Sequence, residues 1–290
     1  MLEDHFYSSL IVWLVSALIL ATIATGLCHV FGAEAQGAGV PELKCILSGA
    51  RMSEVLEFRT LLAKFFGLIA ALGGGFWVGR IGPNIHIGAM IFSEVAKLGY
   101  FKEIRRDSVL KNQGLMIGGA VGFSCAFGTP FAGLIAAVEL VGKITSIRMM
   151  WILFVSLFFG TLTLKFLSMI GIYFFLTTPS IFNKKELIPV IRPLDHLWRL
   201  PVQELLQFAG LGILCGLFSA LFIKLLIKFQ MVRAKPTSPN ILRTRYTYTW
   251  IVVVICALMQ FFIPFLRNGD KIVLNDVFGG DKLDTRCTKF

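Results

Sequence analysis

Charged side chains are scarce in this chain of 290 residues: they make up 16% of it, against 56% hydrophobic residues. Because a soluble domain carries about 25% charged residues, the composition excludes a water-soluble globular protein. Between Phe6 and Ala33 there is no Asp, Glu, Lys or Arg, and that run exceeds the roughly 20 residues needed to cross a bilayer. The composition therefore predicts a multi-pass membrane protein surrounded by lipid.

The start of the chain lacks the basic residues of a signal peptide, and we interpret the first run as a transmembrane helix whose preceding segment is missing or very short. Further apolar tracts cover about residues 65–79, 81–93, 114–142, 149–182, 205–223 and 249–266. Several are too short to span fully, which indicates partial and re-entrant helices. We expect an all-α membrane bundle over residues 1–270, a polar C-terminal tail over 271–290, and an aqueous loop at 97–111.

Acidic residues are absent between Glu204 and Asp270. Six basic residues flank or fill one loop of this interval: Lys224, Lys228, Arg233, Lys235, Arg243 and Arg245. The positive-inside rule places such a loop in the cytoplasm, and by alternation the stretch 183–204 lies outside. The alternative, nucleic-acid binding, is disfavoured because the loop joins two membrane tracts.

Catalytic and metal-binding patterns are also missing. The six cysteines show no C-x-x-C spacing, which argues against a metal site or a disulfide framework. No Ser/His/Asp, His/Cys or paired-carboxylate arrangement stands out, and we interpret His86 as a packed histidine. The sequence thus favours neither an enzyme nor a cofactor.

What the chain does have are two glycine–proline motifs, each at the start of an apolar tract. The first is Gly37-Ala38-Gly39-Val40-Pro41 and the second is Gly79-Arg80-Ile81-Gly82-Pro83. Glycine allows a tight turn, and proline suits the first turn of a helix. The motifs therefore predict open helix N-termini at membrane depth, which favour an anion. Separately, glycines recur at four-residue spacing, which allows close helix packing: Gly75/Gly79, Gly114/Gly118/Gly122 and Gly212/Gly216.

Three segments in register resemble the CLC family of chloride channels and chloride–proton exchangers. The first is Gly37 to Lys44 with Ile46-Leu47-Ser48-Gly49, similar to G-S-G-I-P-E-x-K-x-I-L-x-G. The second is Gly79 to Ile87, similar to G-K-E-G-P-x-V-H-I. The third runs from Gly122 to Gly133 and continues to Val138-Glu139, similar to G-x-x-x-x-F-x-x-P-x-x-G…x-E. The resemblance covers about residues 6–270 and implies the first inverted half of the CLC fold plus the start of the second.

The resemblance also implies a homodimer, or a heterodimer with a CLC relative, in which chloride is the permeant ion. The anion-binding and selectivity residues would be those of the two motifs. Three positions depart from the family. Ala38 replaces the anion-coordinating serine, Ile81 replaces the gating glutamate, and Leu140 replaces the proton-handling glutamate that follows the position of Glu139. Glu139 itself is interpreted as structural.

The last departure from the family concerns the distal part of its fold, whose motifs are not found in this sequence. The chain contains no G-x-F-x-P motif and shows neither the distal anion-binding tyrosine nor CBS domains, so we expect it to be incomplete relative to the family. The hypothesis that follows is a passive chloride channel subunit of the plasma membrane, without proton coupling. The alternative is a truncated, non-conducting subunit that dimerises with or regulates a full-length channel, using the family's dimer-surface elements at 130–142 and 149–170.

Overall fold

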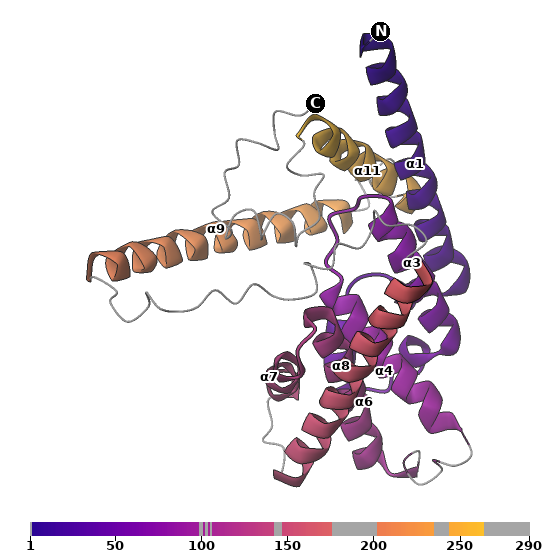
Figure 1. The fold of residues 1–290 in the computed structure, drawn as a ribbon, viewed down its shortest axis with the longest axis vertical. Coiled ribbons are helices and arrows are strands. Elements are labelled where there is room, and N and C mark those ends of the chain that lie inside the picture. The colour runs from indigo at the N-terminus through magenta and orange to yellow at the C-terminus, as the bar shows by residue number, and fades with distance from the viewer. Residues whose placement is uncertain are drawn as a thin grey trace. The chain divides into compact units, whose positions relative to one another are not determined.

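The computed structural model describes residues 2–98, 101, 104, 106–141, 147–175, 202–234 and 244–263, without the side chains of 2–6, 140–141, 171–175, 202–205, 234 and 245. Within these ranges the regular structure is helical, which confirms the all-α prediction. The chain forms two compact units: Met1–Phe182 with Val252–Ile263, and Asn183–Ile251 with Pro264–Phe290. Figure 1 labels most of the helices of the two units.

The first unit is a bundle of long and short helices. Its elements are α1 (Leu2–Phe31), η1 (Ala33–Ala35), α2 (Val40–Leu47), η2 (Glu54–Leu56), α3 (Phe58–Gly73), α4 (Ile81–Lys97), α6 (Ser108–Phe127), α7 (Pro130–Val141) and α8 (Ile147–Phe175). The second unit contains α9 (Val202–Ala234), and α11 (Arg245–Phe262) runs from the second unit into the first at Val252.

Among the described helices, three are long and apolar enough to cross a membrane: Tyr7–Phe31, Ile147–Ile170 and Leu206–Arg233. Others are much shorter, and α7, which lies in the expected tract 114–142, has only 12 residues. At a rise of about 1.5 Å per residue, a helix of that length cannot span a hydrocarbon core of about 30 Å. The prediction of partial helices is therefore confirmed.

The expected apolar tract 114–142 contains the end of α6 and the whole of α7. The helix α6 ends at Gly128, which adopts a left-handed conformation, and Pro130 opens α7. The expected loop 97–111 is also shorter than predicted, because Lys97 belongs to α4 and α6 already begins at Ser108. The Asp107 carboxylate accepts a hydrogen bond from the Val109 amide at 2.8 Å, so an N-cap starts α6 inside a charged segment.

Lys224, Lys228 and Arg233 all lie within α9, with Arg233 in its last turn, so these three residues precede the loop rather than fill it. Lysine and arginine are good helix formers, and their long side chains reach polar surroundings without ending the helix. Within the second unit the Arg233 guanidinium lies 4.2 Å from the centre of the Tyr248 ring. The remaining loop 235–243, most of the stretch 183–204 and the tail 271–290 lie outside the described residues.

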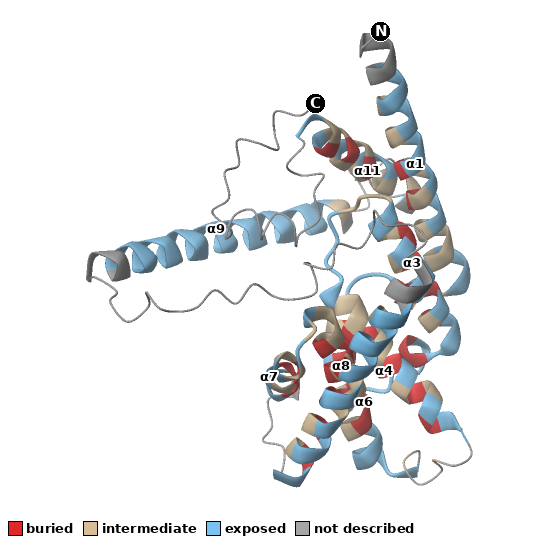
Figure 2. Ribbon diagram, viewed as in Figure 1, coloured by how far each residue is buried: buried red, intermediate tan, exposed pale blue. Residues whose placement is uncertain are grey.

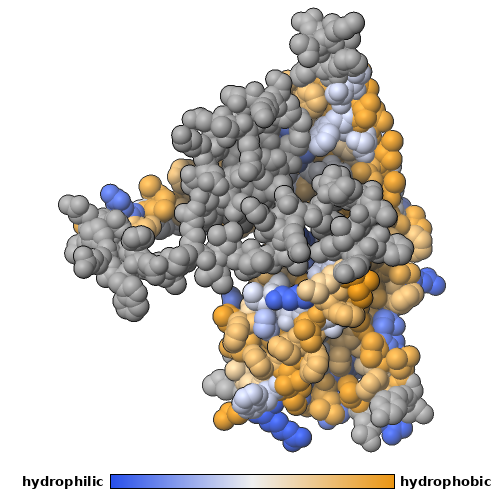
Figure 3. Space-filling view, viewed as in Figure 1, coloured by the Kyte–Doolittle hydropathy of each residue, from blue (hydrophilic) through white to orange (hydrophobic). Residues whose placement is uncertain are grey.

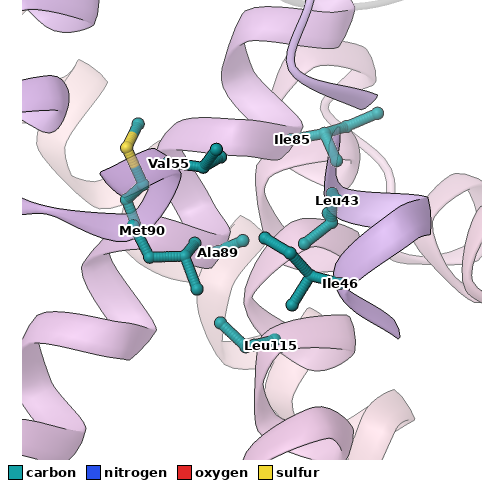
Figure 4. Packing of buried hydrophobic residues seen from close by; sticks show 8 residues of the cluster. Leu43, Ile46, Val55, Ile85, Ala89, Met90 and Leu115 are labelled. Atoms are coloured by element: carbon teal, nitrogen blue, oxygen red, sulfur yellow. The ribbon is translucent and has the colours of Figure 1, made fainter. Parts of the chain in front are cut away.

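The core of the first unit lies where α2, η2, α4 and α6 meet. Figure 4 shows this cluster, which consists of Leu43, Ile46, Val55, Leu56, Ile85, Ala89, Met90 and Leu115. A second cluster joins α6, α7 and α8, and a third joins α1 to the last part of α11. Buried positions concentrate in these helices in Figure 2. The short helices that carry the two motifs thus rest on a packed core.

Glycines allow α4 and α6 to pack with their backbones in contact. A Cβ atom added to Gly118 would lie 2.6 Å from the Gly88 carbonyl oxygen, and one added to Gly122 would overlap the Asn84 carbonyl. The prediction for Gly114/Gly118/Gly122 is therefore confirmed.

The other two glycine pairs differ from this one. Gly75 and Gly79 lie in the loop before α4 rather than on a helix, so they do not form a helix-packing stripe. Gly212 and Gly216 lie on α9 in the second unit.

Large hydrophobic side chains cover much of the described surface, as the orange areas of Figure 3 show. On α8, for example, Trp151 is 66% exposed and Phe166 is 63% exposed. In water such a surface would aggregate or bind a partner. In a protein of this composition it is the surface expected to face lipid.

Candidate functional site

The two glycine–proline motifs lie where the sequence predicts, at the N-termini of α2 and α4. Gly39 is the N-cap of α2 and Arg80 is the N-cap of α4. No side chain caps either helix, so the backbone N–H groups of the first turn have no local acceptor. Such an end carries a partial positive charge and stabilises an anion by about 0.3–1 kcal/mol when exposed and by up to about 2 kcal/mol when partly buried.

The neighbouring helices α6 and α7 have acceptors at their N-termini. Asp107 caps α6, as described above, and the Gly133 amide in the first turn of α7 donates to the Ser124 hydroxyl oxygen at 3.1 Å. Ser124 is fully buried. At α6 and α7, therefore, one amide each is bound by a side chain of the protein, whereas α2 and α4, like α3, have no side-chain cap.

The fold brings the two motifs into contact, although 42 residues separate Gly39 from Ile81 in the numbering. A Cβ atom added to Gly82 would lie 2.7 Å from the Ala38 Cβ and 3.4 Å from the Ala38 carbonyl oxygen. Glycine at position 82 is thus required for the first turn of α4 to approach the loop before α2. The sequence predicts two open helix ends, and the structure makes them neighbours.

Beneath the first motif lies a buried polar chain. The Lys64 Nζ lies 2.8 Å from His86 Nδ1, and His86 Nε2 lies 3.0 Å from the Val55 carbonyl oxygen. Because the lysine ammonium can only donate and the carbonyl can only accept, Nδ1 is the acceptor and Nε2 carries the proton. Lys64 is 3% exposed and His86 is fully buried.

His86 also supports the turn at Gly39. Gly39 has a φ of 79°, in the left-handed region, and a Cβ atom added there would overlap the His86 side chain. The imidazole is held at both nitrogens, and the N-cap residue of α2, Gly39, packs directly against it. The interpretation of His86 as a packed histidine agrees with this burial, but sequence reasoning missed its contact with the motif.

Lys64 was not found by sequence reasoning either, although it lies in α3 directly before the predicted apolar tract 65–79. Lys64 interacts electrostatically with Glu42 in the first turn of α2. The Glu42 Oε2 atom is buried and makes no hydrogen bond. The region beneath the first motif therefore holds a buried ammonium and a partly buried carboxylate, and the positive group is fixed by its imidazole acceptor.

The two altered motif positions sit at the helix ends themselves. Ala38 is exposed in the loop before α2, and Ile81, 38% exposed, is the first residue of α4. Neither side chain offers a hydroxyl or a titratable group. At these two positions an anion therefore meets backbone N–H groups and helix dipoles rather than a side-chain donor, and the nearest cationic side chain of the motifs is that of the N-cap residue Arg80, which is exposed.

The third altered position, Leu140, is the penultimate residue of α7, and its side chain lies outside the described part of the chain. Glu139, one residue earlier, is exposed. In the described ranges no group of three or more His, Cys, Asp or Glu side chains lies close enough together to hold a metal ion.

Comparison with known proteins assigns this chain to a family. A family model described as "Voltage gated chloride channel" matches residues 20–285. This chain belongs to the voltage-gated chloride channel family. The match extends over the two motifs, the third segment and the helices that pack around them.

Individual relatives agree with the family assignment. The "Chloride channel protein" of Tetronarce californica is 33% identical over 267 residues, covering 90% of this chain and 32% of that protein. "Chloride channel protein 1" of Homo sapiens is 29% identical, covering 87% of this chain and 25% of that protein. The chain thus spans about a third or less of these relatives.

A solved structure places the fold in the same family. The crystal structure of a eukaryotic CLC transporter superposes with a TM-score of 0.69 and 27% sequence identity, covering 94% of this chain and 46% of that one. The bundle of long, short and broken helices is therefore the CLC transmembrane fold, represented over somewhat less than half of the structural relative. Relatives in this family are integral membrane channels and transporters.

Proposed function

We propose that this chain is a subunit of a passive CLC-type chloride channel. Chloride is held at the uncapped N-termini of α2 and α4 and passes down its gradient without proton coupling. The observation that carries the proposal is the contact between these two helix ends, made through Ala38 and Gly82. Two partial positive charges side by side attract one anion more strongly than either alone.

The absence of a titratable side chain at the α4 N-terminus supports a channel over an exchanger. A glutamate at position 81 would compete with the anion and take up protons, whereas isoleucine does neither. Leucine at position 140 likewise cannot relay a proton. Anion movement through this site is therefore independent of a proton gradient.

Selectivity at the first motif depends on the backbone alone. A hydroxyl at position 38 would add one hydrogen bond to a charged ligand, worth about 1.5–3 kcal/mol. With alanine there, we expect chloride to be bound more weakly than in a relative that has the serine. Weak binding still permits conduction, since an ion must leave a site as readily as it enters.

The subunit composition and the cellular location of the protein are proposed from its family membership. We propose that the working protein is a homodimer, or a heterodimer with a CLC relative, in the plasma membrane. The open faces of α7 and α8 support pairing, because they form an apolar hollow lined by Leu134, Ile147, Met150, Trp151 and Phe154.

Voltage clamp of cells expressing the 290-residue chain tests the proposal, with the chloride gradient and the external pH varied independently. We expect a reversal potential that follows chloride and does not move with the proton gradient. A reversal potential that shifts with the proton gradient contradicts the proposal.

A second function deserves a test because the apolar hollow between α7 and α8 exists whether or not the chain conducts. In that alternative the chain is a non-conducting subunit that pairs with a full-length CLC channel and alters its current. It predicts surface protein without current when the chain is expressed alone, and a changed current when it is expressed with the relative. Finding only monomers in native membranes, by single-molecule subunit counting, contradicts this alternative.

A further inference from the structure

The loop between α3 and α4 begins with a turn whose amides are all satisfied locally. The amides of Gly74, Gly75 and Phe76 donate to the carbonyls of Ala70, Leu72 and Ala71 respectively, at 2.9–3.2 Å. Gly75 has a φ of 74°, a left-handed conformation that glycine adopts without strain. Four residues after this turn, Gly79 begins the second motif.

The Gly75 carbonyl accepts a hydrogen bond from a side chain that is distant in the sequence. Gln260 on α11 is 6% exposed, and its Nε2 donates to the Gly75 carbonyl oxygen at 2.6 Å across 185 residues of sequence. A Cβ atom added to Gly75 would lie 2.7 Å from Gln260 Oε1. In apolar surroundings an amide is costly unless it is hydrogen-bonded, so the Gln260 side chain is fixed by this contact.

The same turn is held from a second side by packing. Phe76 lies against the cluster formed by Ala17 and Ala21 of α1 with Val253 and Ala257 of α11. The next two side chains are not held in this way, since Trp77 is 52% exposed and Val78 is 45% exposed. The hydrogen bond at Gly75 and the packing of Phe76 are therefore the contacts that hold this loop before α4 begins at Ile81.

We infer that Gln260 is a positioning residue for the second motif: it fixes the Gly75 turn and, through it, the N-terminus of α4. The consequence is that α11, which follows the α9 segment in the chain, determines where one of the two open helix ends lies. The consequence for chloride rests on the proposed function, but the positioning itself does not.

Hydrogen–deuterium exchange of the purified full chain in lipid nanodiscs tests the inference without any current or anion. Gln260→Met keeps the length of the side chain and removes the amide, while Gln260→Glu keeps the size and polarity but offers the Gly75 carbonyl no proton when ionised. Met259→Leu, at a neighbouring position that is 42% exposed, is the matched control.

In Gln260→Met and Gln260→Glu we expect the hydrogen-bonded amides of Gly74, Gly75, Phe76 and Asn84 to exchange about tenfold faster, the factor expected when one hydrogen bond that holds a segment is lost. The amides of α6 should not change, and Met259→Leu should match the wild type. Unchanged exchange at residues 74–84 in both Gln260 variants overturns the inference.

A rise in exchange throughout both Gln260 variants would mean that they misfold, and the wild-type protein then supplies the test. Solid-state NMR with carbonyl-labelled glycine and side-chain-labelled glutamine detects the close pair of Gln260 Nε2 and the Gly75 carbonyl. The absence of this pair overturns the inference. The two proposals fail separately: a chain that carries no current but keeps the Gly75 turn protected contradicts only the proposed channel.

Discussion

Replacing Gly39 with alanine tests whether the turn at the N-terminus of α2 rests on His86. Two costs arise at this position. A left-handed backbone, with φ at 79°, costs a residue with a Cβ about 1–2 kcal/mol. The overlap of the new Cβ with the imidazole adds about 1–3 kcal/mol, the range for overpacking a tight site. The sum predicts a loss of about 2–5 kcal/mol of stability.

The same motif supplies a matched control. Gly37 has a nearly equal φ of 73°, and a Cβ atom added there meets nothing within 4 Å. Gly37→Ala should therefore cost only the backbone strain, about 1–2 kcal/mol. The difference between the two variants isolates the contact with His86, and its expected size is about 1–3 kcal/mol.

Thermal denaturation of the detergent-solubilised protein, followed by size-exclusion chromatography, measures both variants. We expect Gly39→Ala to lower the midpoint about twice as far as Gly37→Ala, since destabilisation of 1 kcal/mol lowers the midpoint of a chain of this size by about 2–4 °C. In a His86→Ala background the additional effect of Gly39→Ala should fall to that of Gly37→Ala, as in a double-mutant cycle. Equal shifts for the two glycines in the wild-type background would refute the reasoning.

Three further predictions concern helix packing and the anion site. Gly122→Ala should reduce stability by about 1–3 kcal/mol or prevent folding, because the Cβ overlaps the Asn84 carbonyl, whereas Gly26→Ala in open space on α1 should be neutral by the same thermal assay. Ala38→Ser should tighten chloride binding by about 1.5–3 kcal/mol, measured by isothermal titration calorimetry, and an unchanged affinity would place the anion elsewhere. Ile81→Glu should reduce the chloride current at neutral pH because its carboxylate occupies the α4 N-terminus. External acid should restore that current by protonating the carboxylate, and a current reduced equally at all pH values would contradict this role.

Much of the fold could be predicted from local sequence because the bilayer restricts the chain to few alternatives. Uncharged runs such as residues 6–33 must form helices in lipid, where no water satisfies the backbone. Glycine and proline at residues 37–41 and 79–83 mark helix N-termini for equally local reasons. An apolar tract does not mark where its helix ends, as in α9, which continues past Lys224 to Ala234 because lysine is compatible with a helix.

The sequence by itself therefore determined that the protein is surrounded by lipid, that it is helical and that two helices begin at the glycine–proline motifs. Each of these features depends on a few consecutive residues. Only the tertiary structure decided that the N-termini meet through Ala38 and Gly82, that His86 and Lys64 lie beneath the first of them, and that Gln260 holds the turn before the second. These contacts join residues as far apart as 185 positions. No local pattern encodes such a pairing, since it depends on how every helix between the two residues packs.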